Sequence, residues 1–143
     1  MQPTFNPDSS HMYRDIVLVN RYAALASSMG DKTAFQPGDV VALKSPLNPS
    51  ALVIKRLIAL PQSLVRTLPP HPESTVRVPQ GHCWVEGDER FHTRDSNSLG
   101  PVPLGCVVGK VEWIVWPPSR FGPVAERPGW EKRVVTPQQN FFA

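Results

Sequence analysis

Short runs of Val, Ile and Leu alternate along the chain with turns rich in Pro, Gly, Asn and Asp, and apolar positions at helical spacing are scarce. Short β-branched runs bounded by turn residues are typical of β-strands. The pattern therefore predicts a mainly β domain with many short strands, in which the sheet is coiled or partly closed. We expect a short helical turn at residues 23–30, and strands at residues 15–22, 40–44, 51–59, 64–67, 75–78, 82–86 and 105–116.

Composition agrees with one domain of this kind. The chain has 143 residues, and its 17 prolines exceed the usual share of about 5%. Proline interrupts helices and central strands, so it favours short strands joined by many corners. We expect residues 1–118 to form the domain and residues 119–143, which are rich in proline and charge, to form a loosely attached tail.

Several classes of function are not expected. The net charge of +3 is small and no long Lys/Arg run is present, so nucleic-acid binding is not predicted. The four histidines and the cysteines at 83 and 106 lack metal-ligand spacing, so no metal or other cofactor is predicted. No apolar run reaches the roughly 18–20 residues of a membrane span. Whether Cys83 and Cys106 pair is left open, because spacing alone cannot place two thiols within bonding distance.

The run of residues 51–59 carries the strongest chemical signal, because two adjacent cations interrupt an otherwise apolar strand. Successive side chains of a strand point to opposite faces, so Lys55 and Arg56 lie on different faces. Lys55 then has aliphatic neighbours on its own face, and loss of hydration disfavours a charged amine. Such a lysine can act as a general base, although an ordinary strand lysine that extends its amine to water is the commoner case.

Three further segments place Lys55 in a known context. They are the N-terminal motif Met1-Gln-Pro-Thr4, the pair Gly87-Asp88, and residues 93–101, which read Thr-Arg-Asp-Ser-Asn-Ser-Leu-Gly-Pro. In this order, together with Lys55-Arg56, they resemble the type I signal peptidase family. The Asp-Ser-Asn form of the last segment is similar to the subunit 2 branch of the mitochondrial inner membrane peptidases. The resemblance extends from Met1 to about Pro118 and implies a signal-peptidase-like fold.

The resemblance implies a serine endopeptidase that works with a Ser/Lys dyad. Lys55 matches the general base, Thr93 matches the hydroxyl residue that orients the lysine, and Asp95 matches the acidic residue that supports the site. Without the resemblance, Thr93 reads as an ordinary turn hydroxyl and Asp95 as an Asx-turn at a loop corner.

Substrate contacts also follow from the resemblance. Met1, Phe5, Val53 and Ile54 match positions that line a shallow pocket for small side chains. The substrate is expected to lie extended against the strand that carries Lys55, by backbone pairing.

The chain departs from the family pattern at its first residue. The family places its nucleophilic Ser immediately before Met-x-Pro-Thr, and here that motif begins at Met1, so the expected Ser is absent from the chain as written. The membrane-spanning segment that precedes the motif in the family is missing as well.

The implied function is removal of sorting signals from precursor proteins delivered to the mitochondrial intermembrane space. The implied location is the mitochondrial inner membrane, on its intermembrane-space side, and the implied partner is inner membrane peptidase subunit 1, in a heterodimer. One alternative is a catalytically inactive subunit that stabilises the peptidase complex. A second is a β-barrel binding module unrelated to peptidases.

Overall fold

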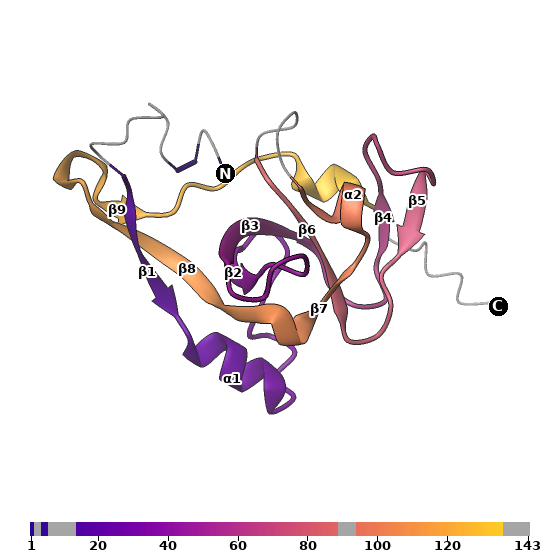
Figure 1. Cartoon of the computed structure of the whole chain (residues 1–143), viewed down its shortest axis with the longest axis horizontal. Coiled ribbons are helices and arrows are strands. Elements are labelled where there is room, and N and C mark those ends of the chain that lie inside the picture. Colours follow the sequence, from indigo (N-terminus) through magenta and orange to yellow (C-terminus); the bar gives the residue numbers. More distant parts are fainter. Residues whose placement is uncertain (2–3, 6–13, 89–93, 136–143) are drawn as a thin grey trace.

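The computed structural model describes residues 1, 4–5, 14–88 and 94–135, and it is mainly β, as the sequence predicted. All strand pairs are antiparallel, and the larger sheet has the order β1-β8-β2-β3-β6-β7, with β9 paired to β8. Figure 1 shows this sheet strongly curled around β2 and β3. Its strands are β1 (Ile16–Asn20), β2 (Val40–Lys44), β3 (Leu52–Ala59), β6 (His82–Glu86), β7 (Val102–Pro103), β8 (Val107–Trp116) and β9 (Gly122–Pro123).

A second sheet has three strands in the order β10-β4-β5 and lies to one side of β6 (Figure 1). Its strands are β4 (Leu64–Arg66), β5 (Thr75–Arg77) and β10 (Val134–Val135). The two strands predicted from residues 64–67 and 75–78 thus form a hairpin, and the third strand comes from near the end of the described chain.

β3 lies at the centre of the larger sheet and separates two layers of core. On the face of Lys55, apolar side chains of β2, β3, β6 and β8 form one cluster, which includes Leu43, Leu57 and Val85. The opposite face carries two clusters, one around Phe5 and Val40 and one around Trp84. The predicted alternation along residues 51–59 therefore separates Lys55 from Arg56 as expected.

Among the described residues, two α-helices and three 3-10 helices lie between the strands. α1 (Tyr22–Ser28) corresponds to the predicted helical turn, and α2 (Ser96–Leu99) lies within the segment that resembles the signal peptidase motif. The sequence analysis did not anticipate α2, because four residues are too few to show helical periodicity. Asp95 begins this helix as its N-cap, and its side chain accepts a hydrogen bond from the Asn97 amide.

Residues 119–135, called here the C-terminal stretch, do not form the loosely attached tail that their composition suggested. β9 pairs with β8, β10 pairs with β4, and Trp130 packs beside Gly38. Gly38 has φ +96°, and a Cβ atom there would lie 2.7 Å from Trp130 Nε1. The prolines of this stretch mark corners in an ordered segment, while a domain boundary at residue 118 stays a prediction.

Both cysteines are free thiols, and Cys83 is fully buried on the Lys55 face of the sheet. Burial, assisted by the neighbouring Cys106, raises the pKa of Cys83 to about 12. Across residues 14–88 and 94–135 no helix is long and apolar enough to cross a membrane.

Candidate active site

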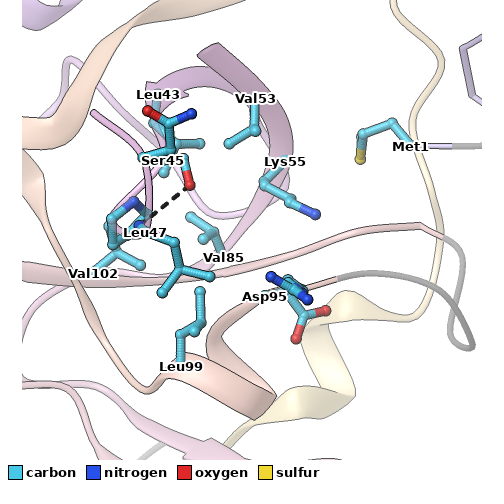
Figure 2. Close-up of a pocket in the computed structure, with 13 residues that line it drawn as sticks. Met1, Leu43, Ser45, Leu47, Val53, Lys55, Val85, Asp95, Leu99 and Val102 are labelled. Carbon is cyan, nitrogen blue, oxygen red and sulfur yellow. Dashed lines mark hydrogen bonds between the residues drawn. The ribbon is translucent and has the colours of Figure 1, made fainter. Parts of the chain in front are cut away.

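Lys55 lies in a cleft of about 480 Å³ on one face of the larger sheet. Val53 of the same strand and Leu43 of β2 lie beside it, as expected from the register that pairs Val41 with Lys55 and Leu43 with Val53. Figure 2 shows Met1 on the side of the cleft towards which the Lys55 amine points. The far side of the cleft is apolar and is formed by Leu47, Leu99 and Val102.

Along its first half, the strand that carries Lys55 is paired with another described strand on one edge only. β2 pairs with Leu52 to Arg56, whereas β6 pairs with β3 only from Arg56 onward. Among the described strands, none occupies the β6-side edge of residues 52–55. That edge borders the cleft, and a strand edge of this kind can pair with an extended peptide.

The environment of Lys55 favours the uncharged amine. Burial lowers the pKa of Lys55 below its ordinary value, and the carboxylate of Asp95 opposes this shift without cancelling it. Desolvation penalises the ammonium ion because the half-buried side chain has lost part of its hydration. A larger fraction of Lys55 is therefore neutral near physiological pH than for an exposed lysine, which is what a general base requires.

Asp95 holds the loop that faces Lys55. Its side chain is buried, Oδ1 accepts a hydrogen bond from the Asn97 amide (2.9 Å), and Oδ2 accepts one from the Gly87 amide (3.3 Å). The first contact is the Asx-turn that the residue type alone suggested. The second joins α2 to the end of β6, so Asp95 both shapes the turn and fixes it beside the lysine.

A buried ion pair lies on the opposite face of β3. The Arg56 guanidinium donates to both carboxylate oxygens of Asp88, at 2.9 and 3.0 Å, and the two side chains are only 3% and 2% exposed. Thr4 donates its hydroxyl to Asp88 Oδ2. The ion pair thus holds the last residue of the N-terminal motif, while Met1 at its start reaches the cleft.

Burial on its own would raise the pKa of Asp88. Hydrogen bonds from Arg56, Thr4 and Arg127, with the charge of Arg56, outweigh burial and hold the pKa of Asp88 below its ordinary value. Asp88 is therefore a carboxylate at neutral pH, paired with Arg56 and hydrogen-bonded to Thr4 and Arg127.

Three arginines of the C-terminal stretch stabilise this arrangement. Arg120 donates to the Thr4 carbonyl (2.7 Å), and Arg127 donates to the Asp88 carbonyl (2.8 Å). Arg133 donates to both carboxylate oxygens of Glu86, at 2.7 and 2.6 Å. The sequence analysis missed these residues, since nothing in a Pro-rich charged segment indicates which carboxylates its arginines will reach.

Asn97 connects three segments of the fold through its side chain. Its side-chain amide donates to Glu86 (2.9 Å) and its carbonyl oxygen accepts from the Leu68 amide (2.7 Å). Asn97 therefore links α2 to β6 and to the loop after β4. Arg133 supplies the cation that pairs with Glu86 there.

The structure brings together only some of the predicted site residues. Lys55, Asp95, Met1 and Val53 line one cleft. Phe5 and Ile54, which the resemblance suggested as substrate contacts, do not line it. Phe5 is 5% exposed in the core on the Arg56 face, and Ile54 packs against the same cluster because strand alternation turns it away from Val53.

Two members of the predicted site cannot be placed. Thr93 lies outside the described residues, and the serine expected before Met1 lies outside the printed sequence. Within the described part of the chain, no group of three or more His, Cys, Asp or Glu residues is arranged to hold a metal ion.

Comparison with known proteins gives the family. Residues 63–116 match the model of the family described as "Signal peptidase, peptidase S26". The mitochondrial inner membrane protease subunit 2 of Schizosaccharomyces pombe is 41% identical over 135 residues, which cover 94% of this chain and 69% of that protein. The chain belongs to the signal peptidase family, peptidase S26. The family resemblance inferred from the motifs is confirmed.

Other members of the signal peptidase family are similar as well. The mouse mitochondrial inner membrane protease subunit 2 is 45% identical over 121 residues, covering 85% of this chain and 65% of that protein. A solved signal peptidase I from Enterococcus faecalis V583 has a TM-score of 0.46 and 26% identity, and covers 53% of this chain and 95% of its own.

The chain spans about two thirds of the length of these curated relatives of the signal peptidase family. Their names confirm the mitochondrial inner membrane as the location expected from the sequence.

Proposed function

We propose that this protein is a serine endopeptidase with Lys55 as general base, and that its nucleophile is a serine joined directly to Met1. The observation that carries the proposal is the half-buried Lys55 amine, whose pKa is lowered, in the same cleft as Met1. Consecutive Cα atoms are about 3.8 Å apart, so a residue bonded to the Met1 nitrogen starts from a point at the edge of this cleft.

The reaction follows from the state of Lys55. The neutral Nζ accepts the proton of the serine Oγ as Oγ attacks the carbonyl carbon of the scissile peptide bond. The resulting ammonium gives that proton to the leaving amine as the C–N bond breaks, and an ester joins the serine to the acyl part of the substrate. Lys55 then accepts a proton from water, the hydroxide attacks the ester carbonyl, and the proton returns to Oγ as the acid leaves.

Thr93 and Asp95 are proposed to position Lys55. A hydroxyl donor or acceptor at Thr93 would orient the amine. Asp95, two residues further along the sequence, is itself held by hydrogen bonds from the Asn97 and Gly87 amides. Its charge also favours the ammonium form that arises during the reaction.

The substrate is proposed to bind as an extended strand along the unpaired edge of β3, beside residues 52–55. Met1 and Val53 would contact the residues next to the cut, and the apolar far side of the cleft would take apolar side chains. Small residues at the cut site fit a cleft whose floor is formed by branched aliphatic side chains.

The relatives are named as subunits of a mitochondrial inner membrane protease. We therefore propose a heterodimer with subunit 1 of that protease, and precursor proteins bound for the intermembrane space as substrates. Anchorage of the pair in the membrane through a segment before Met1 belongs to the same proposal.

The test is cleavage of a fluorogenic peptide with alanine at the cut site, in detergent, with subunit 1 present. One version of the protein has the printed sequence, and the other carries serine and its preceding residues before Met1. Cleavage by the extended version alone supports the proposal. Cleavage by neither version favours the inactive stabilising subunit, and equal cleavage by both would overturn the assignment of the nucleophile.

Lys55 variants of the extended version test the base. Lys55→Met and Lys55→Arg should each abolish cleavage, because a thioether cannot accept the proton and a guanidinium stays protonated. Lys44→Met is the matched control, since Lys44 is the exposed lysine at the end of the neighbouring strand. Retained cleavage in Lys55→Arg would remove Lys55 from the mechanism.

A further inference from the structure

The cleft that contains Lys55 holds a second cationic side chain with no assigned role. Arg94 lines the cleft and is exposed, immediately before Asp95. Its guanidinium makes no hydrogen bond or ion pair with any residue that the structure describes. A guanidinium has five donors in a planar fork that matches a carboxylate.

Arg94 differs in this respect from the arginines that maintain the fold. Arg56, Arg120, Arg127 and Arg133 each donate to a carboxylate or a main-chain carbonyl at 3.0 Å or closer. Their donors are used within the protein. Arg94 instead lines the cleft in which the substrate is proposed to lie.

Among the described residues that line the cleft, no carboxylate forms an ion pair with Arg94. Asp95 is the one acidic residue among the described residues that line the cleft, and its oxygens accept hydrogen bonds from the Asn97 and Gly87 amides. Asp95 is 8% exposed, whereas Arg94 is on the surface of the cleft.

The polar side chains on the opposite rim are uncharged, and their oxygens already accept hydrogen bonds. The Asn48 side chain accepts from the Ser50 amide and hydroxyl, and the Ser45 hydroxyl accepts from the Leu47 amide. Apart from Lys55, Arg94 is thus the charged donor that the described cleft presents to a bound peptide.

We propose that Arg94 determines specificity by pairing with an acidic side chain of the substrate, close to the cut. The inference rests on the proposed function, because it assumes that a peptide occupies this cleft. Arg94 immediately precedes Asp95 in the sequence. Figure 2 places Asp95 on the Lys55 side of the cleft, away from its apolar end. The acidic residue therefore lies within two or three positions of the scissile bond, since the strand rise is about 3.3 Å per residue.

The experiment compares peptide pairs that differ only in Asp against Asn at one position, at each of the three positions on either side of the cut. The extended protein with subunit 1 should cleave one Asp peptide about fivefold faster in kcat/KM than its Asn partner. That preference should shrink as the salt concentration rises, because solvent-exposed charge pairs are screened.

Three variants make the assignment specific. Arg94→Gln should remove the preference while cleavage of the Asn peptide is retained, and Arg94→Glu should reverse it in favour of Lys at the same position. Arg21→Gln is the control, because it removes the same charge from an exposed arginine that does not line the cleft.

The outcomes separate the inference from the function on which it rests. If no peptide is cleaved, the proposed function fails and the inference fails with it. If the Asn peptides are cleaved and no Asp peptide is preferred, or if Arg94→Glu keeps the original preference, only the role of Arg94 is overturned.

Discussion

Replacing Asp88 by asparagine should destabilise the protein strongly, because it leaves the Arg56 guanidinium buried without its counter-charge. The two side chains are 3% and 2% exposed and share two hydrogen bonds of 2.9 and 3.0 Å. Removal of one partner from a buried ion pair costs about 3–5 kcal/mol. Arg127, 39% exposed, adds little, because an exposed pair contributes about 0–1 kcal/mol.

Urea denaturation followed by tryptophan fluorescence measures this loss. With a slope of about 2 kcal/mol/M, the midpoint of Asp88→Asn should fall by about 1.5–2.5 M relative to the unsubstituted protein. Asp31→Asn is the matched control, because Asp31 is exposed and its carboxylate accepts hydrogen bonds from Thr33 within its own turn. Its midpoint should stay close to that of the unsubstituted protein.

A double variant and a pH series test the cause. Arg56→Met combined with Asp88→Leu removes both charges and should recover much of the lost stability, since apolar residues replace a buried pair at little cost. The pKa of Asp88 is lower in the folded protein, so its stabilising contribution is complete above the ordinary carboxyl pKa of about 3.9 and is lost as the pH falls through the lower folded value. Asp88→Asn should lack this acid-dependent component.

The reasoning is refuted if Asp88→Asn loses less than about 1 kcal/mol, the range of exposed pairs. It is refuted equally if the double variant is no more stable than the single one, since the loss would then come from packing and not from an uncompensated charge.

Three other perturbations have defined outcomes. Lys55→Met should raise the free energy of unfolding by about 0.5–2 kcal/mol near pH 7, measured by urea denaturation, because the cost of a partly desolvated ammonium disappears. This gain should fade as the pH rises through the lowered Lys55 pKa. Gly38→Ala should destabilise the protein more than Gly30→Ala, measured by thermal unfolding, because both have positive φ but only Gly38 would place its Cβ against Trp130. Arg120→Met should lower peptide cleavage by the extended protein and destabilise it in urea denaturation, because it releases the Thr4 carbonyl and takes the cation from Asp15, whose side chain is 2% exposed.

The sequence was sufficient to predict most of the larger sheet. The strand at residues 40–44 coincides with β2, and the strand at 82–86 coincides with β6, because both are apolar runs bounded by turn residues. The segment predicted as one strand at 105–116 begins instead with a 3-10 turn at Leu104–Cys106, and β8 starts at Val107. β7, β9 and β10 have two residues each, too few to show alternation.

The candidate site was predictable only where a motif or strand alternation applied. Alternation separates Lys55 from Arg56, and it also places Ile54 on the wrong face to line the cleft. The partners of Arg120 and Arg133 depend on how distant segments fold together, and no local pattern encodes that. Arg94 is part of the motif, but the sequence alone does not show that it lines the cleft without a partner among the described residues.

The contacts of the C-terminal stretch have a consequence for synthesis of the protein. A ribosome makes Thr4 and Asp88 well before the three arginines that contact this region. It also makes β1 and β2 before β8, the strand that lies between them. While the chain is still being translated, the N-terminal motif therefore has no guanidinium of the C-terminal stretch to hold it near Lys55. A chain halted at residue 118 should lack these three arginines and remain without peptidase activity even when it carries the nucleophile. Proteolytic competence is thereby expected only after the C-terminal stretch has left the ribosome.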